Sequence, residues 1–233
     1  MSAEPAVFFP RLRPVGDRAL LVEFGDTVAK ENHDRVLALD AALAADPFEG
    51  FAEAIPAYAS LLVCFDPLAA DHRAVEASVS TLIARGGTLT GQGAVREVEV
   101  CYDADLAPDL GAVAEATGLT PDEVIAAHLR GDYGVSMYGF TPGCAYLAGV
   151  PQEIRLPRKQ AAVRGVPAGS VIIAGPQCLV TTLTTPTGWW IVGRSPTRIL
   201  RDDDPDRPFL FDVGDRVRFR RIAREAFEAK VKS

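Results

Sequence analysis

The residues best suited to chemistry lie in a dense run between positions 138 and 196. The run opens with a loop punctuated by glycine and proline, Tyr138-Gly139-Phe140-Thr141-Pro142-Gly143. Glycines let backbone N–H groups approach a ligand closely, although the same residues also form plain turns between strands. The candidate substrate-binding residues of this loop are Tyr138, Gly139, Phe140, Pro142 and Gly143.

Cationic side chains follow the loop. Arg158, Lys159 and Arg164 fall beside turn-forming positions, and Arg194 follows a short apolar run. The guanidinium of arginine is a planar fork that matches a carboxylate or a phosphate, so these residues favour an anion site. Gln177, in a strand-turn context, can donate to or accept from an amide. The same residues also suit a solvated turn or a structural ion pair, and the spacing leaves both interpretations open.

Histidine and cysteine give weaker signals. His128 lies four residues after Val124 on an expected helix, where apolar packing is the structural interpretation and substrate contact the functional one. The three histidines are scattered, and the four cysteines are widely spaced without a C-x-x-C pair. This pattern predicts neither a metal site nor a disulfide framework.

Composition narrows the class of protein. The formal net charge of −7 over 233 residues disfavours a general nucleic-acid-binding surface. The sequence has no G-x-S-x-G elbow, Walker A loop, G-x-G-x-x-G fingerprint or biotin attachment motif, which argues against a self-contained hydrolase, NTPase or biotin carrier. It also shows no secretion signal and no apolar run of membrane-spanning length, so we expect a cytoplasmic protein without a membrane partner.

The N-terminal part alternates strands and helices. Strands are predicted near 18–24 and 59–65, and each is followed by an amphipathic helix. The first helix places three apolar residues on one face: Val36, Leu39 and Leu43. This alternation predicts an α+β domain of ferredoxin-like type over residues 1–90. A Gly- and Thr-rich stretch at 89–93 marks the expected domain boundary.

Residues 91–233 form the second expected domain. A strand near 95–102 is followed by two short helices, and the second helix begins with a capping box made by Thr120 and Glu123. From Tyr133 onward, short apolar runs are broken by glycine and proline, which is typical of a mainly-β barrel or sandwich. The chain ends in a β-rich piece and a charged tail that is expected to be helical.

Several ordered motifs resemble one protein family. They are Y-G-F-T-P-G-C-A-Y at 138–146, V-P-A-G-S-V at 166–171, A-G-P-Q at 174–177, G-R-S-P at 193–196, G-D-R-A at 16–19 and G-D-R-V at 214–217. These motifs span almost the whole chain. In sequence and in order they resemble the motifs of the family that contains the 5-oxoprolinase B-type subunit and allophanate hydrolase subunit 1. The same carboxyltransferase module occurs in urea carboxylase and in a sporulation histidine-kinase inhibitor.

This resemblance implies a fold and an activity. Relatives have a ferredoxin-like N-terminal domain and a cyclophilin-like β-barrel. They work with a second, carboxyltransferase-type protein, which in 5-oxoprolinase is the C-type subunit. That enzyme also has an A-type subunit, and together they open the lactam ring of 5-oxoproline to glutamate. By this resemblance ATP is used by the assembled complex, and this chain alone binds no cofactor.

The resemblance also implies residue roles. A lactam carbonyl is a poor electrophile, and phosphorylation makes attack by water feasible. Arg158 and Arg194 would then stabilise phosphate or oxyanion charge. Gln177 would orient the amide, so the candidate catalytic residues are these three. Ser170, within V-P-A-G-S-V, and His128 are the remaining candidate substrate contacts.

The chain departs from the family pattern in its motif-rich half. Cys144-Ala145 stands where relatives have Phe-Pro, Ala162-Val163 stands at the second P-R, and 178–182 replaces T-G-I-Y-P. These changes favour a divergent member and leave three functions open. They are a component of a 5-oxoprolinase, a carboxyltransferase component of a biotin-dependent urea or amide carboxylase, and a non-catalytic binding module that inhibits a histidine kinase.

Overall fold

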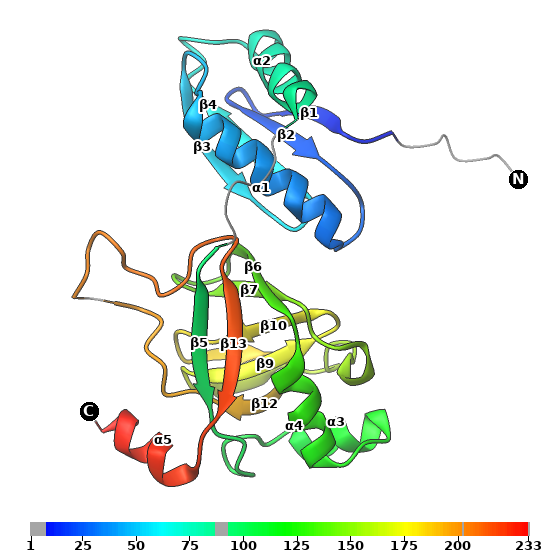
Figure 1. Cartoon of the computed structure of the whole chain (residues 1–233), viewed down its shortest axis with the longest axis vertical. Helices are drawn as coiled ribbons and strands as arrows, with labels where there is room; N and C mark the ends of the chain where they lie inside the picture. The colour runs from blue at the N-terminus through cyan, green and yellow to red at the C-terminus, as the bar shows by residue number, and fades with distance from the viewer. Residues whose placement is uncertain (1–7, 87–92, 202, 233) are drawn as a thin grey trace, which may run out of the picture. The chain divides into compact units, whose positions relative to one another are not determined.

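The computed structural model describes residues 8–86, 93–201 and 203–232, which belong to two units, Met1–Gln92 and Gly93–Ser233 (Figure 1). Each unit has its own apolar core. Residues 89–92 of the expected boundary stretch lie outside the described residues. The mixture of helices and strands confirms the α+β class, whereas the ferredoxin-like and cyclophilin-like names remain predictions.

The first unit is a four-stranded antiparallel sheet with two helices, and its strand order is β1-β2-β4-β3. Its elements are β1 (Arg11–Val15), β2 (Ala19–Glu23), α1 (Lys30–Ala45), β3 (Phe51–Pro56), β4 (Ser60–Phe65) and α2 (His72–Arg85). Alternate residues of the two central strands are buried, for example Leu20 and Val22 on β2. They share one core with the apolar face of α1, and the predicted face of Val36, Leu39 and Leu43 is confirmed.

The second unit is built on a seven-stranded sheet with the order β12-β9-β10-β7-β6-β13-β5. Its elements are β5 (Val95–Val100), α3 (Leu110–Thr117), α4 (Pro121–Arg130), β6 (Tyr133–Tyr138), β7 (Ala145–Ala148), a 3-10 turn (Gln152–Ile154), β8 (Val163–Val166), β9 (Ser170–Ala174), β10 (Gln177–Val180), β11 (Thr185–Thr187), β12 (Trp190–Arg194), β13 (Arg216–Arg221) and α5 (Arg224–Val231). The two edges of the sheet meet just beyond β5. There Cys101 N donates to Arg194 O at 2.8 Å and Arg194 N donates to Cys101 O at 2.9 Å. The sheet is therefore nearly closed into a barrel.

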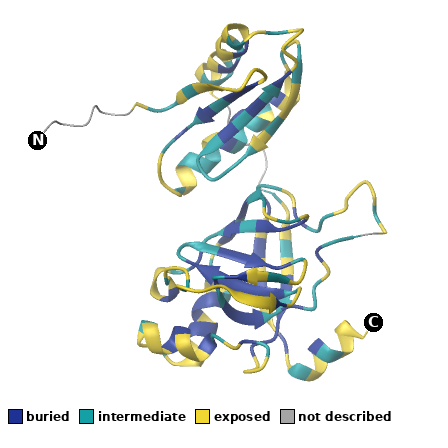
Figure 2. Ribbon diagram, turned by 180° about the vertical axis from the view of Figure 1, so that it is seen from behind, coloured by how far each residue is buried: buried dark blue, intermediate teal, exposed yellow. Residues whose placement is uncertain are grey.

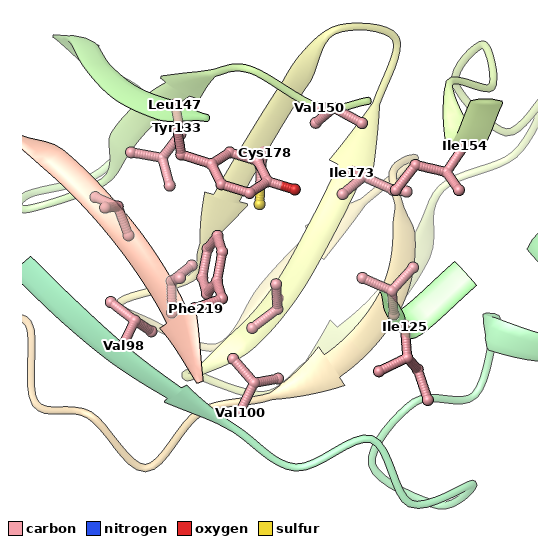
Figure 3. Packing of buried hydrophobic residues seen from close by; sticks show 14 of the residues in the cluster. Val98, Val100, Ile125, Tyr133, Leu147, Val150, Ile154, Ile173, Cys178 and Phe219 are labelled. Atoms are coloured by element: carbon pink, nitrogen blue, oxygen red, sulfur yellow. The ribbon is translucent and has the colours of Figure 1, made fainter. Parts of the chain in front are cut away.

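Side chains of the barrel strands alternate between an interior core and an outer layer. Tyr133, Cys178 and Phe219 lie within the interior core, as Figure 3 shows. On the outer side, Ile172 and Trp189 belong to a second apolar cluster, which also includes Val166 of the two-stranded sheet β11-β8. Strand β9 begins within the V-P-A-G-S-V motif and ends at the first residue of the A-G-P-Q motif.

Helix α4 begins with the capping box that the sequence predicts. Glu123 N donates to Thr120 Oγ1 at 3.3 Å, and Thr120 N donates to Glu123 Oε2 at 2.7 Å. None of the helices in residues 8–86, 93–201 and 203–232 combines the length and apolar character needed to cross a membrane. Within the same residues, no group of three or more His, Cys, Asp or Glu side chains is placed to hold a metal ion.

Candidate functional site

A groove on the second unit collects several motif residues, and its volume is about 930 Å³. The residues that line it are Glu97, Glu99, Ala168, Gly169, Thr181, Thr182, Arg194, Ser195, Pro196, Thr197, Arg198, Ile199, Leu200, Phe227, Lys230 and Val231. The V-P-A-G-S-V motif contributes Ala168 and Gly169, and the G-R-S-P motif contributes Arg194 to Pro196. Two motifs that lie far apart in the sequence thus meet on one surface.

Arg194 is the cation that distinguishes this groove. It is half-buried, and burial lowers the pKa of its guanidinium. Within the described part of the chain, no carboxylate or hydrogen-bond acceptor pairs with that guanidinium, whereas Arg96 and Arg220 of the same unit form ion pairs. A desolvated cation without a counter-charge is costly, and an anionic ligand would supply that charge.

The backbone around Arg194 is fixed by close packing against Gly169. Ser195 N donates to Gly169 O at 2.7 Å, and Gly169 N donates to Thr181 O at 2.6 Å. A Cβ atom at Gly169 would lie 2.4 Å from the carbonyl oxygen of Ser195, and the residue has a φ of +81°. Only glycine fits there without strain, so this glycine of V-P-A-G-S-V positions the G-R-S-P strand end.

The loop predicted to bind substrate borders the groove. Thr182 Oγ1 donates to Pro142 O at 2.8 Å, and its oxygen lies 3.2 Å from Thr141 Oγ1. On the other side of the loop, Gly143 packs closely against Leu200, where a Cβ atom would lie 2.6 Å from the leucine side chain. Thr182 and Leu200 both line the groove, so they connect Pro142 and Gly143 to it.

Other residues of the loop have different surroundings. The Tyr138 hydroxyl donates to Phe211 O at 2.5 Å, and burial raises the pKa of that hydroxyl to about 12. Gly139 N donates to Cys144 O and closes the loop. Phe140 is 68% exposed and has a φ of +70°, unusual for a residue with a side chain. Tyr138 and Gly139 therefore hold the loop in place, and Phe140 projects from it.

Ser170, the next predicted contact, uses its hydroxyl inside the fold. Its Oγ donates to Pro167 O at 2.8 Å, and the residue is buried. Thr181 Oγ1 donates to the same carbonyl oxygen at 2.9 Å and accepts from Ser170 N at 2.9 Å. These bonds connect the start of β9 to the end of β10, which places Ser170 directly behind the groove.

Arg158 and Gln177 lie on a different surface. Gln177 pairs with Ala174 at the far end of β9, whereas Arg194 pairs with Ser170 at its start. Four residue steps along the strand place these ends about 13 Å apart. The exposed guanidinium of Arg158 lies 5.4 Å from the ring centre of Trp189, over the outer cluster. The three candidate catalytic residues are therefore not gathered in one site.

His128 lies in the barrel core. Its ring has no solvent exposure, and its Nδ1 lies 2.8 Å from the Tyr102 hydroxyl and its Nε2 3.7 Å from Cys178 Sγ. Burial lowers the pKa of His128 to about 3. This placement agrees with the packing interpretation, and it keeps the ring out of reach of a ligand in the groove.

The groove also contains residues that the sequence did not single out as site residues. In the sequence, Thr181 and Thr182 stand out only as departures from the family pattern, and Lys230 lies in the charged C-terminal tail. The two acidic residues of the groove are both paired. Glu97 binds Arg220 at 2.7 Å, and Glu99 binds both Arg220 and Lys230.

Comparison with known proteins accounts for this arrangement of motifs. Residues 10–211 match the model of the family described as carboxyltransferase domain, subdomain C and D. The chain belongs to this family. Within it, the chain is 35% identical over 233 aligned positions to the B-type subunit of 5-oxoprolinase from Bacillus subtilis, covering 94% of this chain and 95% of that protein.

Solved structures of similar proteins support the same family fold. TTHA0988 is 35% identical and superposes with a TM-score of 0.79, over 89% of this chain. The chain spans only 41% of the length of TTHA0988. The urea carboxylase of Kluyveromyces lactis has a TM-score of 0.74 over 95% of this chain and 22% of its own, and at 15% identity this likeness shows the fold alone.

Most departures from the family motifs fall at packing positions. Cys144, Ala145 and Cys178 are buried in the apolar clusters inside or outside the barrel wall. Ala162 and Val163 are exposed, away from the groove. Thr181 and Thr182 are the departures that line the groove. Among the departures named above, these two threonines are therefore the ones that change the lining of the groove.

Proposed function

We propose that this chain is one component of a 5-oxoprolinase-type enzyme and holds the anionic part of the substrate in the groove at Arg194. The observation that carries this proposal is a half-buried arginine that has no counter-charge among the residues described by the structure, in a groove lined by two family motifs. Full-length similarity to the B-type subunit of 5-oxoprolinase supports the reaction class.

The groove matches the charges of lactam ring opening. 5-Oxoproline carries a carboxylate, and phosphorylation of its amide adds a second anionic group. Arginine is suited to either group because its donors match two oxygens at once. The hydroxyls of Thr181 and Thr182 and the backbone groups of Gly169 donate or accept hydrogen bonds within the fold, so they position the groove wall while the Arg194 guanidinium faces the ligand. We assign Arg194 the role of binding the carboxylate or stabilising the phosphate charge.

Partner proteins are expected to supply the rest of the chemistry. Glu97 and Glu99 already form ion pairs, so neither is poised as a general base. The sequence has no ATP-binding motif, and the similar protein is itself named as one subunit of an enzyme. We propose that a carboxyltransferase protein like the C-type subunit of 5-oxoprolinase, with a protein like its A-type subunit, binds ATP and activates water. This chain itself then binds no cofactor.

Reconstitution tests this function directly. The chain, its genomic partner proteins, ATP and 5-oxoproline are combined, and release of glutamate is followed. Turnover is expected only in the complete mixture, and Arg194→Gln is expected to lower kcat/KM by about 100-fold or more. Arg158→Gln, on the other surface, is the matched control and should retain most of the activity. A loss with Arg158→Gln and none with Arg194→Gln would place the site on the outer cluster instead.

The similarity of fold to urea carboxylase supports a second candidate function, that of a carboxyltransferase component. Such a carboxylation reaction requires biotin and bicarbonate, which the 5-oxoprolinase reaction does not use. The same complex is therefore assayed with and without a biotinylated partner and bicarbonate. Carboxylation of urea or another amide, with no glutamate from 5-oxoproline, would replace the first proposal.

A further inference from the structure

The C-terminal helix α5 forms one side of the groove. Three lining residues, Phe227, Lys230 and Val231, come from this helix. Their spacing of i, i+3 and i+4 places them on one helical face. Arg194 and Gly169 line the same groove from the barrel. The helix thus turns one face toward the groove that contains Arg194.

The helix is fixed to the barrel at a few points. In its first turn, Arg224 forms an ion pair with Asp105, with both carboxylate oxygens within 2.7 Å of Nη1. Phe227 packs beside Cys101 and Ile222. In the last turn, Lys230 Nζ binds Glu99 Oε2 of β5 at 2.5 Å. This last contact holds the far end of the helix over the groove.

Little of the surface of α5 is packed against the barrel. Phe227 is the one buried residue of α5, and the rest of the helix is exposed or half-exposed (Figure 2). Val231, on the face toward the groove, is 62% exposed. An isolated helix of eight residues is marginal in water, so its order depends on its docking contacts. Opening at this end is therefore expected to break the contacts of Lys230, among them its ion pair with Glu99.

We propose that α5 is a detachable wall of the anion site and that it controls access to Arg194. Lys230 is a positioning residue, because its ion pair with Glu99 keeps the last turn against the barrel. Docked, the helix narrows the groove and adds Lys230 to the cations that line it, Arg194 and Arg198. Undocked, it leaves Arg194 open to solvent and to partner proteins. This inference takes the groove of the proposed function as its site.

Chemical labelling of arginine tests the proposal without requiring turnover. Phenylglyoxal reacts with exposed guanidinium groups, and peptide mass spectrometry gives the rate at Arg194, with Arg158 on the outer surface as the internal reference. Four proteins are compared: the full chain, a chain ending at Ala223, Lys230→Gln, and Lys232→Gln. Lys232 follows the last turn and does not line the groove, so its substitution is the matched control.

Removal of the helix is expected to raise the labelling rate of Arg194 several-fold relative to Arg158. Lys230→Gln should give a smaller increase, and Lys232→Gln should label as the unmodified chain does. Equal rates at Arg194 in the full and the shortened chain would overturn the proposal. If the shortened chain loses native tryptophan emission, it has not folded, and the two point variants test the proposal instead. Equal labelling rates at Arg194 in Lys230→Gln and Lys232→Gln would then overturn the proposal. Failure of the turnover assay leaves this outcome unaffected, so the two proposals fail separately.

Discussion

At the scale of the residue, Gly169 and Arg194 define the groove of the second unit. The family glycine at 169 lets two chain segments meet behind Arg194, because a side chain there would collide with Ser195. Arg194 differs from the other arginines of the barrel in its surroundings. Arginines elsewhere on the barrel, such as Arg96 and Arg220, are paired with carboxylates.

Gly169→Ala tests how tightly the two motifs are packed. Gly165→Ala is a matched control, since Gly165 also has a positive φ, +67°, but has open space where a Cβ would lie. Both substitutions force alanine into a left-handed conformation, which costs about 1–2 kcal/mol. Gly169→Ala should cost about 1–3 kcal/mol more, because it also overpacks the contact with Ser195. Urea unfolding followed by tryptophan emission measures the difference, and equal losses would contradict the packing argument.

At the scale of the element, strong local patterns identified the two central strands and the two helices of the first unit, whereas its edge strands escaped. β1 and β3 lie at the two edges of the first sheet and carry Pro14 and Pro56 among charged or small residues. Edge strands tolerate proline and lack a clear alternation of buried positions, so little in their sequence marks them. Helix α4, by contrast, is marked by its capping residues.

Thr120→Ala tests the start of α4. Loss of the Thr120 side chain leaves one backbone N–H of the first turn without its acceptor. A lost N-cap typically costs about 1 kcal/mol of the free energy of unfolding. Thr120→Ser keeps the hydroxyl and should retain most of the stability. Thermal or urea unfolding compares the two variants, and an equal loss in both would show that the hydroxyl does not stabilise the helix.

At the scale of the whole molecule, two separate cores account for stability, and the tryptophans report on one of them. Trp189 and Trp190 both lie in the second unit, so their emission follows unfolding of the barrel. The polar group buried most completely in that core is His128, which contacts Tyr102, Tyr133 and Phe219. Its burial connects the stability of the barrel to pH.

The barrel is expected to lose stability as pH falls below about 6.5. The unfolded chain binds a proton at His128 near that pH, whereas the folded chain does so only near its lowered pKa of about 3. Stability from this group is therefore complete above the unfolded pKa and declines by at most about 1.4 kcal/mol per pH unit below it. His128→Gln stays neutral and should flatten the decline between about pH 6.5 and 5, above the range of most carboxylates.

Urea unfolding at several pH values, followed by tryptophan emission, measures that decline. His72→Gln, in the first unit, is the control and should keep the slope of the unmodified chain. An unchanged slope in His128→Gln would mean that another group causes the pH dependence.

The sequence by itself determined the family, the α+β class, the central secondary structure and the presence of arginines suited to an anion. These features depend on local spacing and on ordered motifs. Tertiary structure alone decided that Arg194 lies in a groove with Thr181, Thr182 and Lys230, while Arg158 and Gln177 lie on another face. The physical reason is that antiparallel pairing and barrel closure bring together residues far apart in the chain. The spacing of residues in the sequence does not show at which end of a strand a side chain lies. It also does not show which charged side chains pair with that side chain.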